Sequence, residues 1–212
     1  LTKITIPGTI TSFNSSVFAN SGLTEVTINN GIREIGENAF ENTPLTSITF
    51  PKTITRISGL GNSNITNIHF AEGAEPTEIA GNAFSKCKIT TFNIPASVTK
   101  IGTGAFQYSN IQKITIPEAV TTIEGSAFSG SSIQEIVIPE TVTTIGDRCF
   151  SNCKDLVKIT LPDNMIQLPF YIFGECTKLE TIQLPSKLET IGNQSFSNSS
   201  ISTIQLPESL KT

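Results

Sequence analysis

Cysteine is the residue type best suited to redox or metal chemistry in this 212-residue sequence, which contains four. Cys87, Cys153 and Cys176 stand at equivalent positions of a repeated pattern, where other copies have Ser or Thr, and Cys149 replaces an alanine. Such positions favour a small, weakly polar side chain, so we expect buried free thiols. A disulfide between Cys153 and Cys176 is the alternative, if their Cα atoms lie within about 4.4–6.8 Å. A metal site is the third interpretation, but no C-x-x-C pair or histidine partner accompanies them.

His69 is the only histidine and would have to serve as the base if the chain were a hydrolase. That chemistry needs a nucleophile and an orienting carboxylate that converge on the imidazole. The equivalent positions in the neighbouring copies of the pattern hold Thr49 and Asn93, and a flat sheet offers no oxyanion pocket. We therefore expect a non-enzymatic protein.

Three carboxylates, Glu118, Glu140 and Asp163, stand at equivalent positions in three successive copies of the pattern, each directly after a proline. Carboxylates stacked about 5 Å apart could bind a cation or, in a cleft, act as an acid and nucleophile pair. No aromatic platform or cleft accompanies them. A solvated acidic edge is the favoured interpretation and a weak cation site the alternative, so we assign neither a cofactor nor a resident metal.

All of these positions belong to one repeat that runs through the chain. The copies begin at Leu1, Leu23, Leu45, Ile65, Ile89, Ile111, Ile133, Leu156, Leu179 and Ile201. The steps are 22, 22, 20, 24, 22, 22, 23, 23 and 22 residues, and the shared pattern is L/I-x-x-I-x-I/L-P-x-x-V/I-x-x-I-G-x-x-A-F-x-x-C/S-x. Repeats of this length stack into solenoids, because one copy cannot bury its apolar face alone.

Each copy contains three segments that would position these side chains. The I-x-I segment alternates apolar and polar residues, which predicts a short strand with one buried face, and the following proline ends it because it has no N–H to donate. V-T-x-I-G predicts a second, weaker strand on the opposite side, and A-F-x-x-C/S predicts a tight helical or 3₁₀ turn. Phenylalanines of the last segment should stack inside the coil: Phe18, Phe40, Phe84, Phe106, Phe128, Phe150, Phe173 and Phe196.

Two copies depart from the pattern. The third lacks the A-F pair and is two residues short, whereas the fourth is two residues long through AEGAEPTEIA. Because the two together keep the normal length, we predict a local bulge on the convex side. A functional protrusion or kink is the alternative.

The string I-P-x-x-V-T-x-I-G-x-x-A-F resembles leucine-rich repeats of the Treponema or BspA-like class of cell-surface proteins, and the resemblance runs from Leu1 to Thr212. It implies a repeat solenoid, a right-handed coil of mainly parallel β-structure with short 3₁₀ or helical turns. About ten repeats of 22–23 residues would form a single domain, 1–212. The chain lacks the Asn ladder of other leucine-rich repeats and has no room for a long convex helix, so we expect a flatter arc than a horseshoe.

Charge and hydropathy restrict the function further. The formal net charge is −4, without a basic surface for nucleic acid, and no apolar stretch approaches the roughly 18 residues of a membrane span. The resemblance implies a protein-recognition module at the cell surface or outside the cell, which adheres to host cells or extracellular matrix proteins. The alternative is a structural or self-associating spacer that positions another domain.

Outward positions of the first strands form the candidate interaction face. Eight of them lie in four consecutive copies: Thr91, Asn93, Lys113, Thr115, Glu135, Val137, Lys158 and Thr160. Lys113, Glu135 and Lys158 alternate in charge along one column. They would either pair with one another, at about 0.2–1 kcal/mol per contact, or contact a partner.

The chain starts on the first residue of a repeat and stops midway through the tenth, with no capping repeat at either end. Uncapped solenoid ends present apolar side chains and unpaired backbone groups to water. We therefore expect a segment of a longer protein that associates end to end at rising concentration. Its exposed apolar end residues would be Leu1, Ile4, Ile6, Ile204, Leu206 and Leu210.

Overall fold

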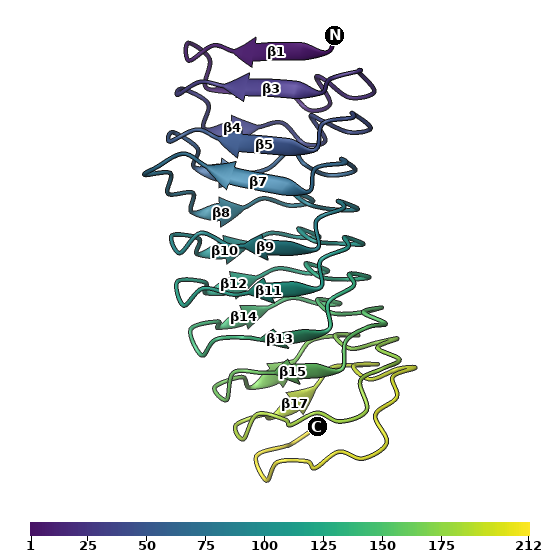
Figure 1. Ribbon diagram of the computed structural model, residues 1–212. Helices are drawn as coiled ribbons and strands as arrows, with labels where there is room; N and C mark the ends of the chain where they lie inside the picture. Colours follow the sequence, from purple (N-terminus) through teal and green to yellow (C-terminus); the bar gives the residue numbers. More distant parts are fainter.

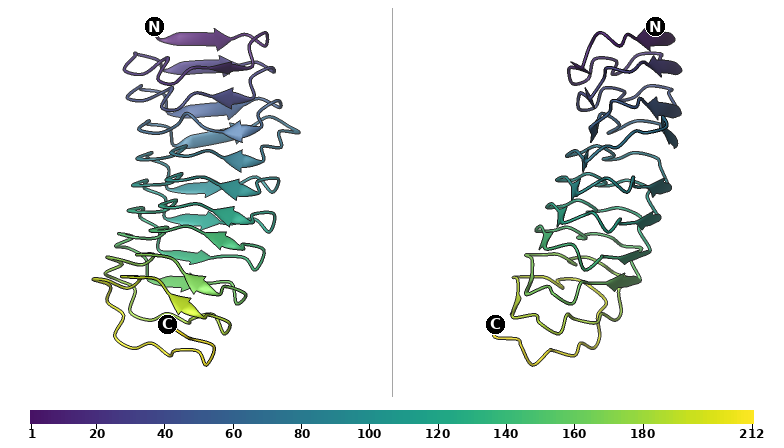
Figure 2. Two further views of the ribbon diagram at one scale, coloured as in Figure 1. Left: turned by 180° about the vertical axis from the view of Figure 1, so that it is seen from behind. Right: turned by 90° about the vertical axis from the view of Figure 1, so that its left-hand side faces the viewer.

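The computed structural model describes all 212 residues as a parallel β-solenoid without helices (Figure 1). Each repeat forms one rung with three sides: a first strand, a second short strand and a run of turns. The rungs stack along one axis from the N-terminus to the C-terminus, and the column bends only gently (Figure 2). The flat shape expected from the repeat length is therefore present.

The first strands lie parallel along one side of the column. Their side chains alternate as predicted: in β5, Ile48 is buried and Thr49 is exposed. The strands pair in register as β1–β3, β5–β7, β9–β11 and β13–β15, and the ninth and tenth repeats add no strand on this side. The bounds are β1 (Lys3–Ile6), β3 (Glu25–Ile28), β5 (Ser47–Phe50), β7 (Asn67–Phe70), β9 (Thr91–Asn93), β11 (Lys113–Thr115), β13 (Glu135–Val137) and β15 (Lys158–Thr160).

The second strands are two residues long and form the opposite sheet. Five of them, β6, β8, β10, β12 and β14, make one continuous parallel sheet, whereas β2–β4 and β16–β17 are separate pairs. The predicted weaker strand is thus present in each of the first nine repeats. The bounds are β2 (Ser12–Phe13), β4 (Glu34–Ile35), β6 (Arg56–Ile57), β8 (Glu78–Ile79), β10 (Lys100–Ile101), β12 (Thr122–Ile123), β14 (Thr144–Ile145), β16 (Gln167–Leu168) and β17 (Thr190–Ile191).

The third side consists of consecutive turns in place of the helical or 3₁₀ turn expected from A-F-x-x-C/S. In the fifth rung the Phe106 N–H donates to the Ala127 carbonyl of the next rung at 2.7 Å, while the Gln107 N–H donates back to the Gly104 carbonyl at 3.0 Å. Positive φ angles of 62° at Gly104 and 54° at Tyr108 accompany this alternation. A helix directs every N–H along its own axis. Here alternate N–H groups bond to the neighbouring rung, so the turns form a third ladder.

One cluster of 48 buried hydrophobic residues forms the core of the column. The predicted phenylalanine stack is confirmed: the Phe106 ring lies 5.0 Å from that of Phe84 and 5.2 Å from that of Phe128, with interplanar angles of 12° and 3°. Leu60 takes the place of phenylalanine in the third repeat and is fully buried. The rings at the two ends of the column are only partly buried. Phe18 has a rung on one side alone, and Phe196 lies beside the last, incomplete rung.

The first sheet is interrupted next to the fourth, irregular repeat, as it also is between β3 and β5 and between β11 and β13. No backbone pairing joins β7 to β9, although β6, β8 and β10 are paired without interruption on the other side (Figure 1). The opening measures about 450 Å³, and its lining includes His69, Phe70 and Phe92. The same lack of pairing separates β11 from β13, which belong to regular repeats, so the convex-side bulge expected for the irregular copies stays a prediction.

The ends of the column match the sequence expectation only in part. Leu1 and Leu206 are exposed, at 66% and 54%. The expected exposure of Ile6 is wrong, because its side chain faces the core, where it is 3% exposed, and Ile6 pairs with Ile28 of the next rung. Half-buried against the core are Ile4, Ile204 and Leu210.

Candidate interaction face

The eight residues of the candidate interaction face lie on four strands of the first sheet, and all eight are exposed. The strands pair in register as β9–β11 and β13–β15, with no ladder between β11 and β13, so within each pair the side chains form two columns two residues apart. Opposite one another stand Thr91 and Lys113, Asn93 and Thr115, Glu135 and Lys158, and Val137 and Thr160. The structure thus brings all eight onto one surface.

No side chain of this face makes a hydrogen bond or an ion pair within the molecule. Glu135 and Lys158 are opposite one another, yet neither they nor Lys113 belong to any of the salt bridges. Pairing of this charged column, one of the two interpretations of the sequence, is therefore wrong for these rungs. The same column does pair at the other end of the sheet, where the Lys3 ammonium lies 2.6 Å from the Glu25 carboxylate.

Apolar side chains interrupt the polar face near its centre. Val137 is 64% exposed and Val157 is 46% exposed. A shallow groove of about 300 Å³ runs between β11 and β13, and its lining includes Thr115, Glu135 and Val137. The face therefore combines an exposed apolar spot with free charges and hydroxyl groups around it.

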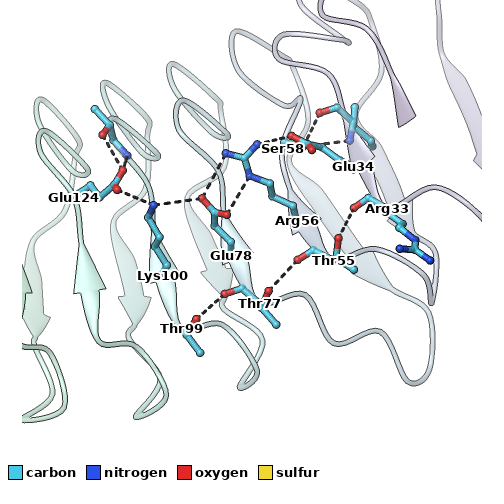
Figure 3. Close-up of polar contacts among 12 residues, drawn as sticks. Arg33, Glu34, Thr55, Arg56, Ser58, Thr77, Glu78, Thr99, Lys100 and Glu124 are labelled. Carbon is cyan, nitrogen blue, oxygen red and sulfur yellow. Dashed lines mark hydrogen bonds and ion pairs between the residues drawn. The ribbon is translucent and has the colours of Figure 1, made fainter. Parts of the chain in front are cut away.

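Sequence reasoning missed a charged column on the second sheet, which is paired throughout (Figure 3). The guanidinium of Arg56 bridges the carboxylates of Glu34 and Glu78, and the Lys100 ammonium lies 3.8 Å from Glu78 and 2.8 Å from Glu124. The hydrogen bond with Glu124 raises the pKa of Lys100, and the same bond lowers that of Glu124. The available signal was the alternation of charge at 22-residue spacing from Glu34 to Lys100. The charged groups of this ladder are therefore paired with one another, and they link five rungs.

Threonines reinforce the same sheet beside the charged ladder (Figure 3). The hydroxyl of Thr55 donates to the carbonyl of Arg33 at 3.2 Å, and that of Thr99 donates to the carbonyl of Thr77 at 3.1 Å. Each bond crosses from one rung to the one before it. Many polar side chains of the second sheet therefore bond to a neighbouring rung.

Comparisons with known proteins agree with this architecture. A sequence profile described as BspA type leucine rich repeat region matches in 6 copies, over residues 1–112 and 99–212. The chain belongs to the BspA-type leucine-rich repeat family. No curated protein matches it.

Solved structures share the fold of this BspA-type chain. A leucine-rich repeat protein from Eubacterium ventriosum is 22% identical with a TM-score of 0.58, over 99% of this chain and 74% of that one. The pneumococcal vaccine antigen PcpA is 16% identical with a TM-score of 0.59, over 99% and 73%. A leucine-rich repeat protein from Bacteroides ovatus is 24% identical with a TM-score of 0.55, over 95% and 52%. At these identities the likeness concerns the fold alone.

The four cysteines of the BspA-type chain are buried free thiols, as predicted. The Cys153 thiol donates to the Phe128 carbonyl and the Cys176 thiol to the Phe150 carbonyl, both at 3.1 Å. Burial raises the pKa of Cys153 to about 12 and also raises the pKa of Cys149 and Cys176. Since the thiolate is the reactive form, burial keeps these thiols in their less reactive, protonated form.

Two of the three carboxylates of the acidic edge accept hydrogen bonds from the next rung, and Glu118 accepts none. Glu140 accepts from the Asp163 N–H at 2.8 Å, and Asp163 accepts from the N–H and hydroxyl of Ser186 at 2.7 and 2.8 Å. The bond from the Ser186 N–H lowers the pKa of Asp163. No group of three or more His, Cys, Asp or Glu side chains is arranged to hold a metal ion. None of the segments is a helix long and apolar enough to span a membrane.

Proposed function

We propose that this BspA-type chain binds a protein of a host cell surface or extracellular matrix through the outward side of β9, β11, β13 and β15. The family match supports a protein-interaction repeat module, and leucine-rich repeat solenoids are generally non-enzymatic scaffolds. Adhesion to a host, and residence at the cell surface or outside the cell, are the finer steps of the proposal, and they rest on the resemblance to BspA-like proteins.

The observation that carries the proposal is the contrast between the two sheets. On the second sheet, Arg56 and Lys100 are already engaged by carboxylates. On the first sheet the eight exposed side chains make no internal polar contact, so their donors, acceptors and charges remain available to a partner. Rigid parallel strands hold them in two columns, which lowers the entropy that binding must overcome.

The chemistry of the face indicates the kind of surface that it would bind. Lys113 and Lys158 would face carboxylates of the partner, Glu135 would face a cation, and Val137 would contact an apolar side chain between them. Exposed charges of this type mainly set the association rate and its salt dependence. The expected complex is therefore specific and weakened by salt.

Charge reversal tests the face directly. A variant with Lys113→Glu, Glu135→Lys and Lys158→Glu should keep the circular dichroism spectrum and lose at least about tenfold in affinity for a bound matrix protein, a loss of about 1.4 kcal/mol. The measurement is binding of the chain to a panel of purified extracellular matrix proteins and to host cells. A matched control, Lys3→Glu with Glu25→Lys, reverses a pair that remains paired and should leave binding unchanged.

The outcomes separate this proposal from the spacer alternative. If wild-type protein binds and the triple variant binds equally well, the interaction face lies elsewhere on the column. If no matrix protein or host cell binds the wild-type chain, the spacer interpretation is favoured. Sedimentation at rising concentration then tests whether such a spacer associates with itself end to end.

A further inference from the structure

The second sheet is interrupted between the seventh and eighth rungs. The five-stranded sheet ends at β14, and β16 pairs only with β17. A groove of about 700 Å³ lies between β14 and β16, lined by residues of both strands and their flanking segments. The rungs stay joined on the turn side, where the Phe150 N–H donates to the Ile172 carbonyl at 3.1 Å. The groove is thus a local opening on the second side, at a step where the turn side remains bonded.

A single proline explains part of this interruption. In the preceding rung, the N–H that follows the second strand, that of Gly146, donates to the Ile123 carbonyl at 2.9 Å. The equivalent residue of the eighth rung is Pro169, which has no N–H. The carbonyl of Ile145 therefore lacks the donor that the carbonyl of Ile123 has.

The remaining ladder bonds of this step are missing as well. The N–H groups of Thr143 and Thr144 both donate to the Thr121 carbonyl, at 3.0 and 3.2 Å. In the next rung, Ile166 and Gln167 occupy these two places, but neither donates to the Thr143 carbonyl. Two strand edges with unpaired backbone groups consequently face each other across the groove.

We propose that this groove is a second binding site, in which an extended segment of a partner protein inserts as a β-strand between β14 and β16. Unpaired strand edges bind extended peptides through backbone hydrogen bonds, and alternate side chains add specificity. Here two edges are available, so an inserted strand can donate to one and accept from the other.

The groove lining indicates which segment would fit. Ile166 is 61% exposed beside the half-buried Met165, which favours an apolar or β-branched residue in the inserted strand. The carboxylate of Asp147 is the only charged group in the lining, and it already accepts from the Phe170 N–H at 3.0 Å. Charge complementarity therefore favours Lys or Arg at this end of the segment.

A synthetic peptide can serve as the probe. Its sequence, acetyl-Thr-Val-Thr-Thr-Ile-Lys-Gly-amide, copies residues 141–145, which end with β14, and adds the lysine expected to face Asp147. Calorimetry on the full 212-residue chain measures its binding. The control peptide has the same side chains with alternate backbone amides N-methylated. Strand insertion predicts at least about tenfold weaker binding of the control, because it lacks the donors for the ladder.

Variants of the chain locate the site. Pro169→Gly restores the N–H that the preceding rung has at Gly146, so it should close the groove and weaken peptide binding at least about tenfold. Pro117→Gly, which removes a corner proline away from the groove, should leave binding unchanged. Asp147→Asn keeps an oxygen that can accept from Phe170 and removes the charge. This variant should bind the lysine peptide several-fold more weakly, and it should bind a peptide with norleucine in place of the lysine as tightly as wild type does.

Amide hydrogen exchange of the free chain provides an independent readout. The amides of Ile166 and Gln167 should exchange quickly in wild type and slow down both with the peptide and in Pro169→Gly. Slow exchange of both amides in the free wild-type chain would overturn the proposal. So would failure of the peptide to bind at millimolar concentration, or binding that ignores N-methylation or Pro169→Gly.

Discussion

Truncating one ring of the phenylalanine stack provides a quantitative test of the core. The ring of Phe106 is fully buried and stacks between those of Phe84 and Phe128 at 5.0 and 5.2 Å. A buried aromatic side chain removes about 150–250 Å² from water. At about 25 cal/mol per Å² the lower figure corresponds to roughly 4 kcal/mol. Intact rungs on both sides prevent collapse of the cavity, so Phe106→Ala should destabilise the chain by about 3–5 kcal/mol.

Urea unfolding followed by circular dichroism measures this change. Since repeat arrays can unfold in parts, hydrogen exchange of the flanking rungs should accompany it and show the loss concentrated there. Phe128→Ala should behave alike, because its ring is also fully buried in the stack. Phe196→Ala is the matched control. Because the ring of Phe196 is only partly buried, its removal should destabilise the chain less. A loss below about 1 kcal/mol for Phe106→Ala would refute the assigned register of the stack.

Two further predictions concern titratable groups. Glu124 has its pKa lowered by the hydrogen bond with Lys100, so the ion pair stabilises the fold above the unfolded pKa of about 4.3 and this stabilisation disappears as the pH falls through the lower folded pKa. The urea midpoints of wild type and Glu124→Gln should therefore differ at pH 7, and the difference should shrink as the pH is lowered further below about 4.3; a difference that stays constant with falling pH would contradict the pairing. The four buried thiols should resist a disulfide reagent for hours at pH 8 and react together in 6 M guanidinium, whereas rapid labelling of the native chain would show that they are accessible.

Much of the candidate interaction face was predictable from sequence because the information is periodic. Strand side chains alternate with period two, so the residue types of β9 and β11 alone indicate that Phe92 faces inward and Lys113 outward. The repeat length then sets which positions become neighbours, and Lys113 stands beside Thr91 as predicted. The turn side was less predictable, because positive φ angles occur at Asn38 but also at Arg148 and other bulky residues. Asparagine is enriched at positive φ, whereas arginine and other bulky residues have no such preference.

What the sequence by itself determined is the solenoid, its inward and outward faces and its column of stacked rings, since each follows from spacing repeated ten times. The tertiary structure alone decided which charged columns pair. Glu34 and Arg56 meet on the second sheet, whereas Glu135 and Lys158 stand opposite one another on the first without forming an ion pair, because an ion pair depends on the distance between two side-chain ends. It also decided that the sheet opens at Pro169. A missing N–H removes one bond, and whether the remaining bonds keep the rungs paired depends on the packing of the whole column.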